Sequence, residues 1–260
     1  MPTGALTSEI DVAQVVLYVF WFFFAGLLFY LRREDKREGY PLENERTQRT
    51  SRVKAVGWPD VPAPKNFKML DGSVVKKPDN KRDSRPVAAK PAARFLGAAM
   101  QPTGNPMTDA VGPAAYAERE DKPERLFERD EPKIAPLRTA AEFNIFEGDP
   151  DPRGKKVIGL DEQVAGTISD VWIDKPDCMI RYLEVDTGQK KVLLPFFLSQ
   201  LARRDGEQVF VAKSVNAAHF KDAPTTKKAD VVTKLEEDKI QAYFGSGHLY
   251  ANRARTEPLV

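Results

Sequence analysis

The stretch VAQVVLYVFWFFFAGLLFYL, from Val12 to Leu31, contains twenty residues and no charged side chain. A helix of that length spans about 30 Å, which is the hydrocarbon thickness of a bilayer. Its Leu, Val and Phe side chains together favour membrane insertion by about 4–8 kcal/mol. A soluble protein would have to enclose such a helix on all sides, which a chain of this size does poorly. We therefore predict a transmembrane helix at residues 12–31.

The charges on either side of this stretch predict its orientation. Glu9 and Asp11 precede it without any Lys or Arg, whereas four basic residues follow it at once: Arg32, Arg33, Lys36 and Arg37. By the positive-inside rule, residues 1–11 lie in the periplasm and the chain after Leu31 lies in the cytoplasm. A secretory signal peptide would have a basic start and an A-x-A-like cleavage site, which this stretch lacks. It also contains no G-x-x-x-G, so we expect it to pack against a larger membrane protein rather than a second copy.

The composition of the whole chain argues against several classes of function. Its 260 residues carry 40 basic and 38 acidic side chains, and the net charge of +2 does not indicate nucleic-acid binding. The single cysteine, Cys178, excludes an internal disulfide, and two histidines, His219 and His248, are too few for a histidine-based metal site. The motifs G-x-x-x-x-G-K-[ST], H-E-x-x-H and G-x-S-x-G do not occur. We therefore expect neither an enzyme nor a metal-binding protein.

Residues 32–153 are rich in Pro, Ala and charge. Prolines cluster around residues 59–64, 78–91 and 102–113, and this density prevents long helices. Two interpretations are open, a disordered tether or an ordered but irregular segment that lies on a partner. The short apolar stretches Asn66–Leu70 (NFKML) and Ala140–Phe146 (AAEFNIF) favour an extended segment packed on partners.

Residues 154–250 have the pattern of a small β domain. Four segments rich in β-branched and aromatic residues predict strands: Val164–Asp174, Met179–Asp186, Lys191–Leu194 and Gln208–Ala212. Their spacing of roughly ten residues indicates an antiparallel barrel or sandwich. Thr233–Phe244 predicts a helix, with Thr233 as N-cap and Glu236 as its capping-box partner. The predicted fold is a single N-terminal transmembrane helix, a mainly-β cytoplasmic domain with a C-terminal helix, and a frayed tail at 251–260.

Six segments of the chain resemble, in order, the H subunit of the photosynthetic reaction centre of purple bacteria. They are the run from Phe20 through Leu31 with RREDKREGYPL (32–42) directly after it, PTGNPMTDAVG (102–112), DPDPRG (149–154), AGTISDVWID (165–174), RYLEV (181–185) and EEDK (236–239). Each is short, but their order across nearly the whole chain is specific. The resemblance implies that residues 154–250 form a PRC-type β-barrel, and that the chain is an accessory subunit without catalytic activity of its own.

The resemblance also implies partners, location and role. Such subunits lie in the bacterial inner (intracytoplasmic photosynthetic) membrane with the L and M subunits, the core light-harvesting antenna, membrane lipids and often a cytochrome subunit. They stabilise L and M, shield the quinone–iron region and assist proton delivery to the secondary quinone. Bacteriochlorophyll, bacteriopheophytin, quinone and non-haem iron belong to L and M, so this chain is expected to bind no cofactor directly. The alternative is a non-photosynthetic, membrane-tethered adaptor with a PRC-type barrel.

The same resemblance points to residues for proton transfer. Asp174 and Asp177 match acidic positions at a proton entrance, Arg181 matches a basic position further in, and Lys133 matches a basic position beside the carboxylates. Proton uptake by a buried quinone needs titratable groups linked through water. The alternative for the two aspartates is an Asx-turn beside Pro176.

The loop before Lys133 departs from the pattern of some relatives, which carry a histidine pair there. It reads LFERDEPK, with carboxylates at positions 128, 130 and 131. These carboxylates can collect protons at the surface, as the histidines do in those relatives. We favour the simpler interpretation of a solvated loop.

Overall fold

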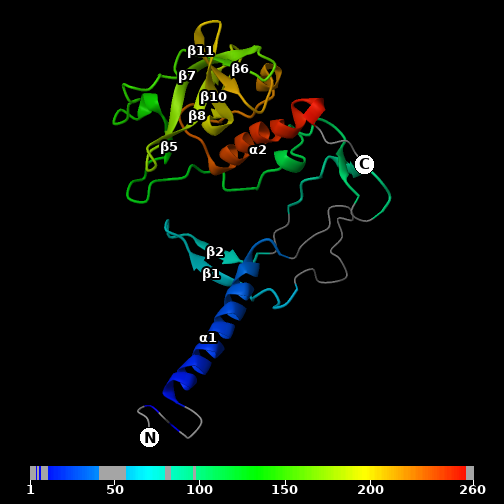
Figure 1. Ribbon diagram of the computed structural model, residues 1–260, viewed down its shortest axis with the longest axis vertical. Coiled ribbons are helices and arrows are strands. Elements are labelled where there is room, and N and C mark those ends of the chain that lie inside the picture. The colour runs from blue at the N-terminus through cyan, green and yellow to red at the C-terminus, as the bar shows by residue number, and fades with distance from the viewer. Residues whose placement is uncertain are drawn as a thin grey trace. The chain divides into compact units, whose positions relative to one another are not determined.

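The computed structural model describes residues 4, 6, 11–40, 57–79, 83–95 and 98–255. Most of the predicted periplasmic N-terminus, and residues 256–260 of the predicted tail, lie outside these described residues. The chain divides into two compact units, Met1–Ser84 and Arg85–Val260 (Figure 1).

The first unit is built on helix α1, Val12–Glu34, which continues as the 3-10 turn η1, Asp35–Arg37. Asp11 caps α1, because its Oδ1 accepts a hydrogen bond of 2.7 Å from the Gln14 N–H. No residue of α1 is buried, and α1 is the one helix among the described residues that is long and apolar enough to cross a membrane. The predicted helix is confirmed, and it extends past Leu31 because Arg32-Arg33-Glu34 are good helix formers.

A β-hairpin follows in the first unit, within the segment for which the sequence predicted no regular structure. Strands β1 (Lys65–Lys68) and β2 (Val74–Lys77) pair antiparallel, with Lys65 opposite Lys77 and Lys68 opposite Val74. The turn is closed by the Met69 N–H, which donates to the Ser73 C=O at 2.8 Å. Gly72 takes the left-handed conformation that this turn requires, with φ of +80°.

The second unit contains one large sheet. Its strands are β5 (Ile134–Pro136), β6 (Lys156–Ile158), β7 (Val164–Asp174), β8 (Met179–Asp186), β9 (Lys191–Pro195), β10 (Ser199–Arg204) and β11 (Glu207–Ala212). The order is β10-β11-β6-β7-β8-β9, and β5 pairs with β7 beyond the end of β6. All pairs are antiparallel except β11 with β6. The four predicted strands are confirmed to within one residue, whereas β5, β6 and β10 were missed.

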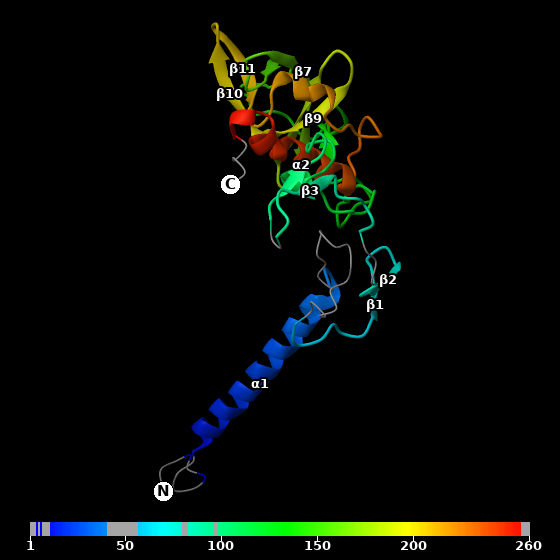
Figure 2. The same cartoon turned by 90° about the vertical axis from the view of Figure 1, so that its right-hand side faces the viewer.

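Helix α2, Lys234–Tyr250, packs against this sheet and lies beside β9 (Figure 2). The predicted cap is confirmed: Thr233 Oγ1 accepts a hydrogen bond from the Glu236 N–H, and the Glu236 carboxylate accepts one from the Thr233 N–H. Ile240 and Phe244 are fully buried in the core with residues of β7, β8 and β9. A side chain at Gly247 would meet the Ser214 carbonyl oxygen at 2.5 Å, so the helix sits as close as a glycine allows.

The predicted domain boundary at residue 154 differs from the structure, which joins residues from Arg85 onward to the sheet. Strands β3 (Ala89–Pro91) and β4 (Met100–Pro102) pair, and the 3-10 turn η2 (Gly112–Ala114) lies against α2. Met107 and Leu137 belong to the hydrophobic core. The chain between residues 85 and 153 thus packs on its own domain, because short apolar stretches between prolines suffice to fill a core and add one edge strand.

Candidate functional site

The residues predicted for proton transfer lie around the turn between β7 and β8. Asp174 is the last residue of β7, Arg181 lies near the start of β8, and Lys133 directly precedes β5. Pairing of β5 with β7 places Ile134 opposite Asp174, and the Lys175 N–H donates to the Lys133 C=O at 3.1 Å. The strand that sequence analysis missed is therefore what brings Lys133 to the turn.

Asp174 lies buried between two cations. Its side chain has no exposed surface, and its Oδ2 lies 3.5 Å from Lys133 Nζ and 3.8 Å from Arg181 Nε. The side chains of Lys133 and Arg181 are 26 % and 40 % exposed. The three residues thus link a carboxylate inside the domain to positive charge at its surface.

One oxygen of Asp174 is held by ion pairs rather than by hydrogen bonds. Asp174 Oδ2 and Ser214 Oγ are the buried side-chain oxygens that accept or donate no hydrogen bond among the described residues. A buried acceptor without a donor costs about 1–3 kcal/mol, and more when it is charged. Such an oxygen has a lone pair that can accept a hydrogen bond from a water molecule.

Asp177 does not join this cluster through its side chain. Asp177 is exposed, and its backbone N–H donates to Asp174 Oδ1 at 3.5 Å. Cys178, which follows, has a φ of +49° and completes the tight turn. The Asx-turn alternative is thus supported for Asp174, whereas Asp177 places a carboxylate at the surface beside it.

Two of the three carboxylates in the loop before Lys133 are ion-paired. Glu131 Oε2 lies 3.0 Å from Lys175 Nζ, which also lies 3.5 Å from Glu142, and Asp130 pairs with Arg125 at 2.5 Å. Glu128 is exposed. The loop therefore anchors the β7–β8 turn through Lys175, in addition to presenting charge to solvent.

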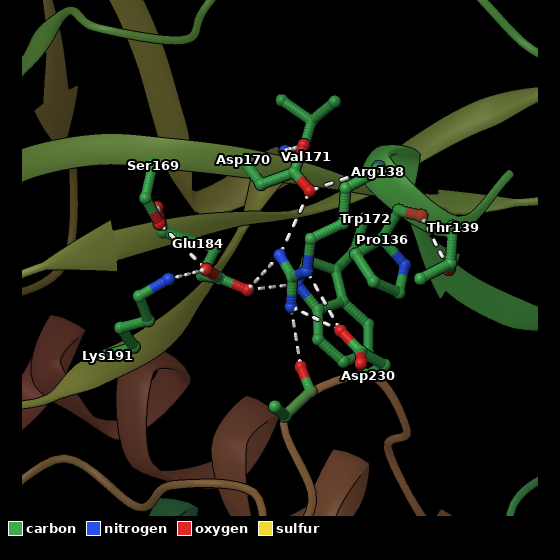
Figure 3. A network of polar contacts seen from close by, with 11 residues as sticks. Pro136, Arg138, Thr139, Ser169, Asp170, Val171, Trp172, Glu184, Lys191 and Asp230 are labelled. Carbon is green, nitrogen blue, oxygen red and sulfur yellow. Dashed lines mark hydrogen bonds and ion pairs between the residues drawn. The ribbon is translucent and has the colours of Figure 1, made fainter. Parts of the chain in front are cut away.

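A second polar cluster, which the sequence did not predict, is centred on Arg138 (Figure 3). Arg138 follows β5 in the 3-10 turn η3, Leu137–Thr139. One of its guanidinium nitrogens donates to Asp170 and Glu184, each at 2.9 Å, and its Nε donates to Asp230 at 2.8 Å. This single side chain therefore ties β5, β7, β8 and the loop before α2 together.

Glu184 is the most fully satisfied carboxylate of the Arg138 cluster. Besides Arg138, it accepts hydrogen bonds from Ser169 at 2.7 Å and from Trp172 and Lys191 at 2.9 Å each. Burial alone would raise the pKa of Glu184, but the hydrogen bonds from its donors lower that pKa to about 2. A cavity of about 600 Å³ opens beside the cluster, between Arg138, Lys190 and Thr225.

One signal in the sequence could have revealed the Arg138 cluster. Glu184 stands between Leu183 and Val185, which are both buried in β8, and Asp170 stands beside the buried Val171 in β7. A buried carboxylate in an apolar strand needs a positively charged or hydrogen-bonding partner, because burying an unpaired charge costs free energy. The identity of that partner, Arg138, was not accessible because it depends on β5.

A third buried group lies at the start of α2. The Tyr182 hydroxyl donates to Glu237 Oε1 at 3.1 Å and accepts a hydrogen bond from Gln241 at 3.0 Å. Burial raises the pKa of Glu237, although the Tyr182 hydroxyl and the nearby charge of Arg181 act in the opposite direction. The charge of Arg181 therefore acts on two buried carboxylates, those of Asp174 and Glu237.

The described residues contain no candidate metal centre. No group of three or more His, Cys, Asp or Glu side chains that could hold a metal ion occurs in the described ranges. The arrangement at Asp174 is a buried carboxylate flanked by two partly exposed cations.

Comparison with protein families covers most of the chain. The family model described as photosynthetic reaction centre, H-chain N-terminal region, matches residues 4–139, which is more than half of the chain. The model of the PRC-barrel domain matches residues 145–217, which contain strands β6 to β11. Both matches agree with the resemblance found in the sequence. The second identifies the part of the sheet from β6 to β11 as a PRC-barrel domain.

Proposed function

Because the chain belongs to the family of photosynthetic reaction-centre H subunits, we propose that its second unit stabilises the L/M core, shields the quinone–iron region and assists proton delivery to the secondary quinone. The family consists of accessory subunits that associate with the reaction-centre L and M subunits and are anchored in the membrane by a single span.

The observation that carries the proton-delivery proposal is the position of Asp174. Asp177 is exposed and takes a proton from bulk water. Water then carries the proton to Asp174, whose Oδ2 faces Lys133 and Arg181 without a hydrogen bond. Asp174 then passes the proton inward, and the carboxylate that remains is flanked by the two cations. No net charge is left in the domain after one transfer.

Replacement of both aspartates by Asn tests this role. The change keeps the shape and the turn, while it removes both titratable groups. We expect slower second electron transfer to the secondary quinone in the assembled complex, a smaller change in the first transfer, and recovery with small weak acids that carry protons past the side chains. Comparison of the double variant with each single variant across pH shows whether the two groups substitute for each other. An unchanged second-transfer rate from low to high pH would leave the aspartates as turn formers only.

The proposed setting is the intracytoplasmic photosynthetic membrane, with the N-terminus in the periplasm and the second unit in the cytoplasm. The charges that flank α1 support this orientation. We further propose that the core antenna and a cytochrome subunit contact the complex, and that the pigments, quinones and non-haem iron are bound by L and M.

The adaptor alternative predicts a different purified complex. A tagged chain isolated from its native membrane in mild detergent should carry pigment-binding subunits, with bacteriochlorophyll absorption in the near infrared. A pigment-free preparation at native expression level would favour the adaptor.

A further inference from the structure

The β1–β2 hairpin is held at the end of the membrane helix by a set of inward contacts. Lys65 Nζ lies 2.5 Å from Glu34 Oε2, and Arg37 pairs with the same Glu34 at 2.8 Å. Arg37 also donates to the Lys77 carbonyl oxygen at 3.1 Å, and Lys36, almost fully buried, donates to the Pro59 carbonyl oxygen at 2.5 Å. Both views show the hairpin beside the C-terminal end of α1 (Figures 1 and 2).

These contacts use one face of the hairpin only. Side chains alternate across a strand, so Lys65 and Phe67 share a face with their partners Val75 and Lys77. That face meets Glu34 and Arg37, and Arg37 lies 5.8 Å from the centre of the Phe67 ring. Two of the four basic residues that follow the apolar stretch, Lys36 and Arg37, are therefore turned inward.

The opposite face and the tip of the hairpin carry exposed apolar groups beside exposed cations. Lys68 and Lys76 lie on this outward face, with Asn66 and Val74, and both lysines are exposed without a described ion pair. Leu70 at the tip is 80 % exposed and Val74 is 63 % exposed. Asp71 is the acidic residue of the tip, and its carboxylate accepts hydrogen bonds from Ser73.

We propose that the outward face and tip of the β1–β2 hairpin lie on the bilayer surface at the C-terminal end of α1, where Lys68 and Lys76 contact anionic lipid headgroups and Leu70 enters the headgroup region. The inference rests on membrane anchoring through α1 and is independent of the proton-delivery role. The surface is continuous with the exposed apolar surface of α1, since the hairpin is tied to Glu34.

The residue types favour lipid over a protein partner as the occupant. Lysine is depleted in the core of protein interfaces, whereas lysines combined with exposed Leu are a feature of amphipathic segments that lie in the membrane interface. Arg32 and Arg33, exposed on the last turn of α1, add positive charge at the same level of the chain. Each Lys or Arg near an anionic surface strengthens attachment about fivefold.

Fluorescence of the full chain in lipid nanodiscs tests the proposal without other subunits. Cys178→Ser removes the single thiol, and Asn66→Cys on the outward face then carries an environment-sensitive dye. We expect a blue-shifted emission, and quenching by headgroup-level spin-labelled lipid, in discs that contain phosphatidylglycerol. Pure phosphatidylcholine discs, or high salt, should reverse both effects.

Lys68→Gln with Lys76→Gln should lower the ratio of docked to free hairpin about 30-fold. Lys213→Gln with Lys221→Gln, which removes the same charge from exposed sites in the second unit, should change nothing. Identical spectra in neutral and anionic discs would overturn the proposal. So would a shift that appears only when pigment-binding subunits are present, since the partner would then be protein.

Discussion

Replacement of Glu184 by Gln should destabilise the β domain by about 2–3 kcal/mol near pH 7 and by much less below pH 3. The Glu184 side chain is 3 % exposed and accepts hydrogen bonds from four donors. Gln keeps the shape, but its NH₂ group replaces one acceptor oxygen. The NH₂ group cannot accept a hydrogen bond, so the N–H and O–H donors that face it lose their acceptor.

The magnitude follows from the pKa of Glu184, which the fold lowers from 4.5 to about 2. At about 1.4 kcal/mol per unit, the ionised form contributes about 3 kcal/mol to stability, of which Gln retains a part through its remaining oxygen. Because the folded-state pKa is the lower one, this contribution is complete above the unfolded-state pKa. It is lost as the pH falls from about 5 towards 2.

Urea denaturation of the full chain in detergent, followed by tryptophan fluorescence at several pH values, measures this difference. Trp172 reports on the site directly, since its Nε1 donates to Glu184 at 2.9 Å. Glu162→Gln is the matched control, because Glu162 pairs with Arg204 on the exposed surface and its loss should leave the urea midpoint unchanged. A difference between wild type and Glu184→Gln that is the same at pH 7 and pH 3 would refute the electrostatic account.

Three further outcomes follow from the structure. Thr233→Ala removes the cap of α2 and should cost about 1 kcal/mol in the same denaturation assay, whereas Thr233→Ser should cost much less. Glu237→Gln should stabilise the domain at pH 8, because burial raises the folded-state pKa of Glu237 and its ionised form opposes folding. At pH 4 this gain in stability should vanish, and a lower stability of the variant at pH 8 would contradict the reasoning. Lys36→Met removes the hydrogen bond to Pro59 and should speed amide hydrogen exchange in residues 57–64 without changing exchange in 154–250. Equal exchange in the wild type and the variant would show that the contacts of Arg37 are sufficient to hold this segment.

The parts of the fold that could be predicted are those whose pattern is local. Twenty uncharged residues gave α1, alternating β-branched residues gave β7 and β8 to the residue, and a threonine three residues before a glutamate gave the start of α2. β5 and β6 have three residues each, which is too short for a period to appear. Their strand character comes from pairing with β7, which is a property of the tertiary structure.

The candidate site was predictable to a similar degree. Lys133, Asp174 and Arg181 lie close together and the side chain of Asp177 is at the surface, while their role in proton transfer stays a prediction. Asp170 and Glu184 signal buried charges in β7 and β8, but their partner Arg138 could not be identified, because an arginine in a Pro-rich segment has the pattern of a surface residue. Only the pairing of β5 places it against Asp170 and Glu184.

The position of Arg138 limits where this chain can be divided into fragments for expression. The two family models divide it between residues 139 and 145, as if an anchor and a barrel could be separated there. A barrel expressed from residue 145 would lack β5 and Arg138, so Asp170 would lose its cation and Glu184 one of its two. The workable cut lies upstream, near the division between Ser84 and Arg85, where one compact unit ends and the next begins. The compact unit that contains the barrel therefore begins at Arg85, well before residue 145, where the match to the PRC-barrel domain starts.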